Sequence, residues 1–320
     1  MMPPAPVTTS LAAAASPGDK RPSATRVMMS ASDIDLDLGR VTVLTGPTAG
    51  GKSALALALA RRVGGVIINA DASQLYECLR VLTARPGAAD ESMVPHRLYG
   101  VLAGDDVCSA ARWAELAKAE IAAARAAGLH PILVGGTGLY LAALVQGLAP
   151  VPVIDADVRA AVRALPTDAA RAALEREDPA SAARLMPADR QRTARALEVV
   201  RSTGQPLAHW QQQRSGGIGE AAVQGLVVDR PRAELHARAE TRLRAMLADG
   251  ALDEVARLLA LRLSADAPVM KALAVPQLAA HLAGTCTLAE AMAQALFATR
   301  QYQKRQSTWA RGQVPDWRRI

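Results

Sequence analysis

The fold is set between Val41 and Ser53, by the run VTVLTGPTAGGKS. Its first part, Val41 to Thr45, is apolar and β-branched and stops at a glycine, which predicts a short strand. Its second part, Gly46 to Ser53, fits the phosphate-loop pattern G-x-x-x-x-G-K-S/T. Alanines and leucines then alternate from Ala54 to Arg62 and predict a helix. A strand, a glycine loop and a helix in this order predict a loop that binds phosphate.

Each part of this loop has a physical task. The glycines let the backbone N–H groups converge on phosphate oxygens, and the N-terminus of the following helix adds a partial positive charge. Lys52 supplies a full charge, and the Ser53 hydroxyl is a candidate ligand for Mg²⁺. The same cradle serves ATP, GTP or another diphosphate, so the pattern leaves the ligand open. We expect the diphosphate to contact Gly46, Pro47, Thr48, Ala49, Gly50, Gly51, Lys52 and Ser53.

Further apolar runs predict the rest of a sheet. Val66 to Ala70 ends at Asp71, Pro131 to Val134 ends at Gly135, and Val223 to Val228 follows much later. Strands that read as largely continuous apolar runs, between predicted helices, are typical of a parallel sheet covered on both faces. The helices are predicted at 110–127, 231–247, 252–261, 275–282 and 288–310. The predicted fold is α/β, a phosphate-loop core with a parallel sheet covered by helices, plus an all-helical insertion.

The domain organisation follows from changes in pattern. Residues 1–38 are rich in Ala, Ser, Thr and Pro without periodicity, so we expect a disordered N-terminal extension. A transit peptide is the alternative, but Asp19 and the prolines make a poor amphipathic helix. Residues 150–215 contain only helical patterns broken by prolines and predict the helical insertion. The core then comprises residues 39–149 and 216–320.

Composition narrows the functional class. The 320 residues carry 37 Lys and Arg against 30 Asp and Glu, a net charge of +7 that suits a polyanionic partner. The 3 cysteines are far apart and include no CxxC pair, so neither a disulfide framework nor a zinc cluster is expected. No apolar run reaches the roughly 18 residues needed to span a bilayer. We expect a cytoplasmic, monomeric protein without membrane contact.

Polar residues at the ends of the predicted strands are candidates for chemistry. Asp71 is the best-placed carboxylate, because the strand that follows the loop helix should emerge next to the loop. It could serve as a magnesium ligand, a helix cap or a general base. Thr137 lies in a second glycine-rich turn, Gly135 to Tyr140, which is either a tight turn or part of the ligand crevice. His96 we interpret as structural.

Two predicted helices carry basic faces. One helix is predicted between Asp189, its N-cap, and Gly204, the glycine that ends it. This helix carries Arg190, Arg192, Arg195 and Arg201. In the last helix, Arg300, Lys304 and Arg311 recur at spacings of four and seven, with Arg305 beside them. Either basic face alone is typical of a solvated helix. Two basic faces in a protein that also has a phosphate loop favour contact with a nucleic-acid backbone.

Taken in order, these segments resemble the tRNA dimethylallyltransferases, also called isopentenyl-diphosphate:tRNA transferases. The likeness runs from about Val41 to the C-terminus. The segments that carry it are the phosphate loop, Asn69-Ala70-Asp71, Gln74-Leu75-Tyr76, Leu82 to Pro86, Pro95 to Leu98, Leu133 to Tyr140, Arg195 to Val199 and Lys304 to Trp309.

The resemblance implies transfer of a dimethylallyl group from dimethylallyl diphosphate to N6 of an adenine next to the anticodon of tRNA, with Mg²⁺. Asp71, Lys52 and Thr137 would be catalytic, with Asp71 accepting a proton from the exocyclic amine. Lys52 would neutralise the departing diphosphate, and Ser53 would bind Mg²⁺. The expected contacts to the anticodon stem-loop are Asp71, Ala72, Ser73, Gln74, Thr137, Arg159, Gln191, Arg192, Thr193, Ala194, Arg195, Arg300 and Lys304.

The chain departs from the family pattern at a few positions. Ala72 stands where the family commonly has serine, and Ala274 where it commonly has glycine. Ser307 and Ala310 stand where aromatic residues are common. Two other functions remain to be separated by experiment: a small-molecule kinase with ATP in the loop, and a non-enzymatic RNA-binding protein with a degenerate loop.

Overall fold

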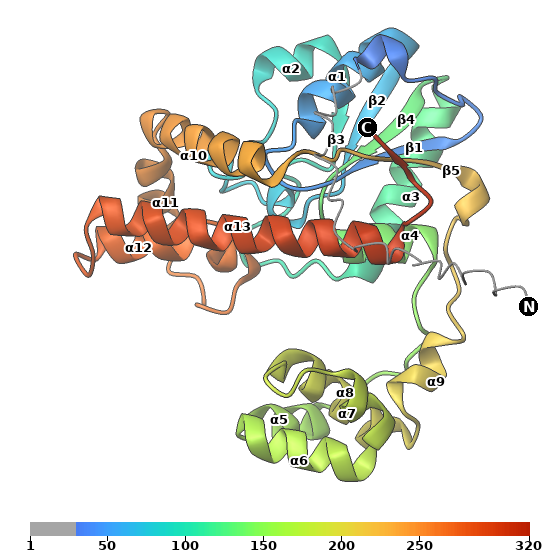
Figure 1. Ribbon diagram of the computed structural model, residues 1–320, viewed down its shortest axis with the longest axis vertical. Coiled ribbons are helices and arrows are strands. Elements are labelled where there is room, and N and C mark those ends of the chain that lie inside the picture. Colours follow the sequence, from blue (N-terminus) through green and yellow to red (C-terminus); the bar gives the residue numbers. More distant parts are fainter. Residues whose placement is uncertain (1–29) are drawn as a thin grey trace, which may run out of the picture.

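The computed structural model describes residues 30–320, which form a sheet-centred core and a helical body below it (Figure 1). The sheet has 6 parallel strands in the order β3-β2-β4-β1-β5-β6. The predicted parallel sheet is confirmed. The strands are β1 (Val41–Thr45), β2 (Gly65–Asn69), β3 (His96–Arg97), β4 (His130–Val134), β5 (Val223–Val227) and β6 (Arg318–Arg319).

Helices cover both faces of this sheet, as the continuous apolar strands predict. Side chains alternate along a strand, so Val43 and Ile68 pack into one hydrophobic core while their neighbours Leu44 and Ile67 pack into the other. The second core is closed by α1 (Lys52–Val63), and the first by α3, α4 and the C-terminal helices. These helices are α3 (Ala110–Ala126), α4 (Gly138–Val145), α10 (Arg232–Ala248), α11 (Ala251–Ala260), α12 (Val275–Leu282) and α13 (Leu288–Gln313).

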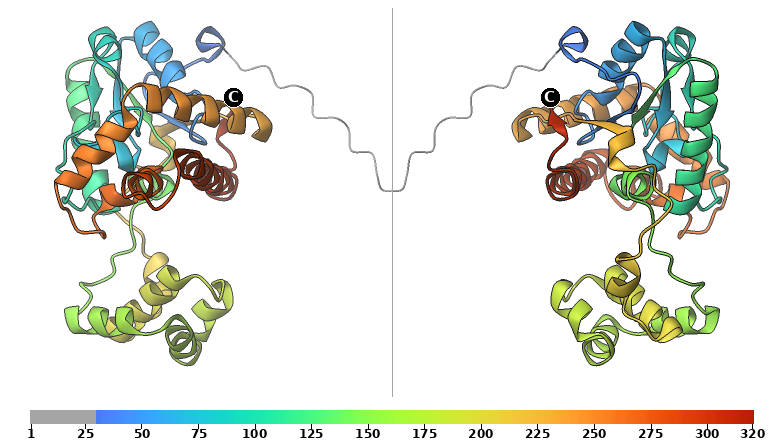
Figure 2. Two further views of the ribbon diagram at one scale, coloured as in Figure 1. Left: turned by 90° about the vertical axis from the view of Figure 1, so that its left-hand side faces the viewer. Right: turned by 90° about the vertical axis from the view of Figure 1, so that its right-hand side faces the viewer.

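The predicted helices between residues 150 and 215 are present and pack around a small apolar core of their own. Two chain segments connect them to the rest of the molecule, as both side views show (Figure 2). At this neck, Leu148 and Ser215 exchange two backbone hydrogen bonds of 3.1 Å. The helices are α5 (Ala156–Ala164), α6 (Thr167–Glu177), α7 (Pro179–Arg184), α8 (Arg190–Thr203) and α9 (Leu207–Gln211).

The strand order corrects one sequence-based expectation. β2, which leads to Asp71, does not lie next to β1, because β4 lies between them. No sequence pattern predicted β3, β6 or the short helix α2 (Ala88–Met93). The two strands have two residues each and the helix has six, which is too short for a recognisable periodicity. None of the helices within residues 30–320 combines the length and the hydrophobicity that a bilayer span requires.

The N-terminal prediction is wrong for residues 30–38; the predicted disorder of residues 1–29 lies outside the described residues. Ile34 is fully buried beside α1, and Arg62 donates hydrogen bonds to the carbonyls of Ala31 and Ile34. The Gln224 side chain accepts from the Asp37 N–H at 2.9 Å and donates to the Asp35 carbonyl at 2.8 Å. One apolar side chain and four hydrogen bonds thus order a segment without sequence periodicity.

Ala274 stands at the N-cap of α12 in the left-handed conformation, with φ +69°. This conformation costs an alanine roughly 1–2 kcal/mol and a glycine almost nothing, which explains why the family commonly has glycine here.

We expect Ala274→Gly to raise the free energy of unfolding by about 0.5 kcal/mol, because relief of the strain exceeds the loss of one buried methyl group. The measurement is urea denaturation. Ala280→Gly, inside the same helix, is the control and should instead destabilise by roughly 1 kcal/mol. A loss of stability in Ala274→Gly would contradict the strain argument.

Candidate active site

A cavity of about 350 Å³ lies where the carboxyl ends of the strands meet the C-terminal helices. Lys52, Ser53 and Asp71 line it together. Lys52 and Ser53 follow β1, and Asp71 follows β2. Although β4 separates these two strands, the strands are parallel, so the segments that follow them start at the same edge of the sheet. The other lining residues include Thr48, Ala72, Ser73, Gln74, Leu82, Thr83, Arg242, Lys271, Tyr302 and Arg305.

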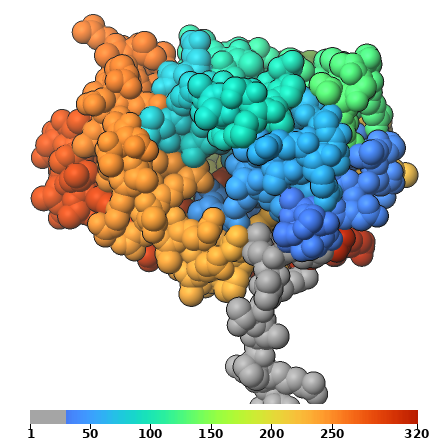
Figure 3. Space-filling model, turned by 90° about the horizontal axis from the view of Figure 1, so that it is seen from above, coloured from blue at the N-terminus to red at the C-terminus, as the bar shows by residue number. Residues whose placement is uncertain are grey.

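The phosphate loop has the backbone that its glycines predict. Gly46 has φ +138°, and a Cβ there would lie 2.4 Å from the Val228 carbonyl oxygen, so only glycine fits. The outer side of the loop is held by α10, where Arg238 donates to the Ala49 carbonyl at 2.8 Å. Seen from above, the surface is hollowed where the orange α10 region meets the blue and cyan segments (Figure 3).

Lys52 begins α1 and points back into the loop, where its Nζ donates to the carbonyls of Gly46 and Pro47, each at 2.9 Å. An ammonium has three donors, so one remains for a ligand oxygen. Burial lowers the pKa of Lys52 to about 8, and the nearby Asp71 carboxylate opposes this shift. Lys52 is therefore still mostly protonated at neutral pH.

Asp71 is fixed on two sides. Asn69, fully buried, accepts from the Asp71 N–H at 2.8 Å and donates to the Asp71 carbonyl at 3.0 Å. One carboxylate oxygen, Oδ1, accepts from the Ser73 N–H at 3.0 Å and from the Ser73 hydroxyl at 2.7 Å. Within residues 30–320 the other oxygen has no hydrogen-bond donor, so it is the oxygen available to accept a proton.

Thr137 joins the second glycine-rich turn to the backbone on either side of Asp71. Its hydroxyl accepts from the Ala72 N–H at 2.9 Å, so Ala72 contributes through its backbone, which does not depend on the side chain present. Tyr302 of α13 lines the cavity, and burial raises the pKa of its phenol to about 12. The turn at Gly135 to Tyr140 is thus part of the crevice wall, and α4 begins within it at Gly138.

Gln306 of α13 ties the two turns together. Its Oε1 accepts from the Thr48 N–H at 2.8 Å, and its Nε2 donates to the Gly136 carbonyl at 3.1 Å. Gln303, one turn earlier, donates to the Thr48 carbonyl at 3.0 Å. The phosphate loop is therefore positioned by a helix about 250 residues away in sequence, a contact that the sequence alone could not reveal.

Two cations at the cavity, Arg242 and Lys271, were not predicted, and Arg305 was expected only on a basic helix face. Arg242 comes from α10 and donates to the Thr83 carbonyl at 3.3 Å, while Lys271 pairs with Asp266 at 2.8 Å. Arg305 lines the cavity and lies 5.4 Å from the centre of the Tyr302 ring. Nothing in the local pattern distinguishes these residues from other surface cations, because their convergence depends on how the C-terminal helices pack.

The predicted tRNA contacts fall into groups. Asp71, Ala72, Ser73 and Gln74 line the cavity and Thr137 lies behind them, whereas Arg159, Gln191, Arg192, Ala194 and Arg195 belong to the helical body. Thr193 is 1% exposed, so its side chain is buried within the helical body, and its predicted tRNA contact stays a prediction. On α13, Arg300 and Lys304 are exposed, and Arg305, rather than Lys304, reaches the cavity.

The basic face of α8 is partly neutralised. Glu198 is buried, and Arg163, Arg195 and Arg159 surround it at 3.0, 3.9 and 4.0 Å. Arg201 forms two hydrogen bonds with Glu177 and so is paired within this body. Asp189 and Gly204 cap α8 as predicted.

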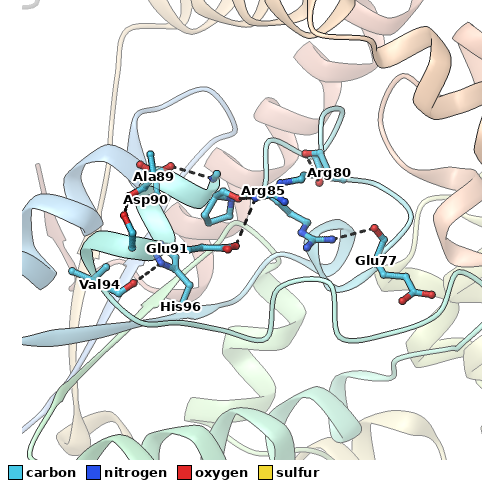
Figure 4. Close-up of polar contacts among 12 residues, drawn as sticks. Glu77, Arg80, Arg85, Ala89, Asp90, Glu91, Val94 and His96 are labelled. Carbon is cyan, nitrogen blue, oxygen red and sulfur yellow. Dashed lines mark hydrogen bonds and ion pairs between the residues drawn. The ribbon is translucent and has the colours of Figure 1, made fainter.

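The helical body and the core share a second cavity of about 900 Å³. Arg163, Arg190 and Gln191 line one side, and Asp266 and Lys271 of the core line the other. Lys271 also lines the first cavity, so the two are neighbours. His96 lies outside both cavities, and its Nδ1 is 3.0 Å from the Val94 carbonyl oxygen, which fits a structural role (Figure 4).

The family model described as IPP transferase matches residues 74–313. This chain belongs to that family. A tRNA dimethylallyltransferase of Sphingopyxis alaskensis is 56% identical over 282 residues, 87% of this chain and 92% of the relative. One of Erythrobacter litoralis is 53% identical over 287 residues, covering 88% and 90%.

Solved structures of the family agree. A tRNA isopentenylpyrophosphate transferase of Bacillus halodurans is 29% identical, with a TM-score of 0.63 over 88% of this chain and 89% of that chain. A eukaryotic dimethylallyltransferase acting on tRNA has a TM-score of 0.75 over 86% of this chain and 70% of that chain. At 23% identity this second likeness shows the fold alone.

Proposed function

We propose that this protein transfers a dimethylallyl group from dimethylallyl diphosphate to N6 of an adenine next to the anticodon of tRNA. One observation carries the proposal: a phosphate loop with its lysine and a carboxylate with an unpaired oxygen line the same cavity. Membership of the IPP transferase family supports the same reaction.

The donor side uses the loop. The C–O bond between the prenyl group and the diphosphate breaks, and negative charge grows on the leaving oxygens. Lys52 and Arg242 would stabilise this charge, together with the N–H groups of the loop and the N-terminus of α1. The allylic carbon would then lie between the loop and Asp71.

The acceptor side uses Asp71. The exocyclic amine of adenine is a poor nucleophile, so alignment against the allylic carbon and removal of its proton both matter. As the N–C bond forms, the amine proton would pass to the unpaired oxygen of Asp71. Asn69 holds the Asp71 backbone and Ser73 holds Oδ1, which fixes the carboxylate at the cavity wall.

Magnesium fits this site as a partner of the diphosphate. The Ser53 hydroxyl lines the cavity and makes no hydrogen bond within residues 30–320, so it is available as a ligand. In the same described range, no three His, Cys, Asp or Glu side chains gather around a metal position. Because Mg²⁺ usually keeps several waters and binds substrate phosphates, one hydroxyl suffices on the protein side. Mg²⁺ would neutralise phosphate charge there.

The tRNA would bind between the helical body and the core. The 900 Å³ cavity offers Arg163, Arg190 and Gln191 to the RNA backbone, and its neighbour Lys271 leads to the reaction cavity. An adenine must leave its stack to reach Asp71. We expect one protein molecule to act on one tRNA, since both cavities are formed within a single chain.

One assay separates this function from the two alternatives. Protein is incubated with unmodified tRNA, Mg²⁺ and either labelled dimethylallyl diphosphate or labelled ATP, and the tRNA is then digested. N6-prenyladenosine is the expected product. Label from ATP alone would favour a kinase, and salt-sensitive tRNA binding without label would favour a binding protein.

The lowered pKa of Lys52 predicts a pH dependence. The ammonium binds diphosphate only when protonated, so kcat/KM for the donor should be constant below pH 8 and fall by up to about tenfold per pH unit above it. Steady-state rates between pH 7 and 9.5 provide the measurement. Lys52→Arg is the control, because its guanidinium stays charged and the alkaline fall should disappear. An unchanged fall in that variant would assign it to another group.

A further inference from the structure

Glu254 of α11 is a buried carboxylate, 5% exposed, outside the reaction cavity. Its Oε1 accepts from the backbone N–H groups of Arg80 at 2.6 Å and Val81 at 2.8 Å, and its Oε2 accepts from that of Leu82 at 2.9 Å. No cation pairs with it among residues 30–320. Its charge acts on the Arg85 guanidinium without forming an ion pair. A buried charge without a direct ion pair is costly, and here three converging N–H dipoles stabilise it.

The turn that Glu254 holds continues directly into the reaction cavity. Leu82 and Thr83 line the cavity wall. The carbonyls of Thr83 and Ala84 both accept from Nε2 of Gln74, at 2.8 and 3.1 Å. These two bonds fix the amide of Gln74, so its Oε1, which has no donor within residues 30–320, is the acceptor left for a ligand N–H group.

Other contacts hold the same segment from its exposed side (Figure 4). Arg80 donates to the Pro86 carbonyl at 2.9 Å and lies 4.0 Å from Glu91. Arg85 donates to the carbonyls of Tyr76 at 3.1 Å and Glu77 at 3.3 Å. Exposed ion pairs contribute little to such a turn, whereas removal of a buried acceptor leaves N–H groups unsatisfied. Glu254 is therefore the buried anchor of this turn.

We propose that Glu254 is a positioning residue for the acceptor nucleobase: it fixes the turn at residues 80–82, which fixes Gln74, which presents Oε1 to an N–H group of the base. The inference rests on the proposed function, because it assigns the base as the ligand of Gln74. It connects a helix of the C-terminal bundle to base recognition in the reaction cavity.

The test is a double-mutant cycle on prenyl transfer to tRNA. Glu254→Gln keeps one acceptor oxygen but places an amide donor opposite the Leu82 N–H, and kcat/KM for tRNA should fall about tenfold. In Gln74→Ala, kcat/KM for tRNA should fall by a similar factor. If Glu254 acts through Gln74, the double variant should lose no more than about twofold beyond Gln74→Ala alone.

Two controls complete the design. Asp253→Asn changes the exposed neighbouring carboxylate on α11 and should leave the rate unchanged. Glu254→Asp keeps the charge but shortens the reach, and it replaces Glu254→Gln in the cycle if that variant does not fold. Circular dichroism and urea denaturation establish folding for each variant.

The outcomes are distinct. Non-additive losses support the inference. Multiplying losses, or a Glu254→Gln enzyme as active as the wild type, overturn it while the proposed function stands. An inactive wild-type protein overturns both.

Discussion

Asp71→Asn is expected to lower turnover about a hundredfold or more while tRNA affinity stays unchanged, as for loss of a general base. Asparagine is the informative replacement because Asp71 also caps the short helix Ala72–Leu75 by accepting from the Ser73 N–H. An amide oxygen can accept that bond, but it cannot take a proton at neutral pH. Single-turnover prenyl transfer gives the rate, and filter binding gives the tRNA affinity.

Two further variants sharpen this prediction. Asp71→Ala removes both the base and the cap, so it should add a stability loss of about 1 kcal/mol to the same rate loss. Asp105→Ala changes an exposed carboxylate outside the cavity and should be silent. If tRNA binding collapsed in Asp71→Asn while the rate at saturating tRNA survived, Asp71 would be a binding residue and the proton would go elsewhere.

Gly136→Ala is expected to lower kcat/KM for the donor roughly 30-fold or more. A Cβ at Gly136 would lie 1.9 Å from Nε2 of Gln306 and 3.2 Å from the Gly46 carbonyl oxygen. Gln306 would have to move, and the Thr48 N–H would lose its acceptor. A lost hydrogen bond combined with overpacking costs about 2–3 kcal/mol. If this cost falls on the phosphate loop and weakens donor binding, it corresponds to the expected fall in kcat/KM. Initial rates at varied donor concentration measure it.

Gly312→Ala is the matched control, since it makes the same change on α13 with no atom within 4 Å of the new Cβ. It should leave the rate unchanged. The double variant Gly136→Ala, Gln306→Ala removes the clash but does not restore the hydrogen bond to the Thr48 N–H. Relative to Gly136→Ala alone, it should therefore recover more of the stability than of the rate. A Gly136→Ala enzyme with unchanged donor kinetics would show that the loop does not depend on Gln306.

Local sequence patterns predicted most of the core. The helices at 52–63, 110–126, 232–248 and 288–313 match the predicted ranges to within a few residues, because each has its own periodicity and end signals. The phosphate loop was predictable for a similar reason: its conformation depends on its own glycines and on the strand and helix that directly flank it.

The neighbours of the loop were not predictable. Gln306, Arg242 and Tyr302 reach the site from helices that have no sequence link to it, and β4 separates the strands that carry Lys52 and Asp71. Thr193 shows the opposite case, since it stands within a basic run yet is buried in its own helical body.

The sequence by itself determined the phosphate loop, the elements around it and the residues Lys52, Ser53 and Asp71, because short-range sterics and hydrogen bonds fix these over a few residues. Only the tertiary structure decided which strand lies between them, which cations surround the cavity and which glutamines hold the loop. These features depend on packing between segments that lie far apart in the chain. The free energy of this packing comes from burying apolar surface, and no local sequence pattern predicts which surfaces will meet.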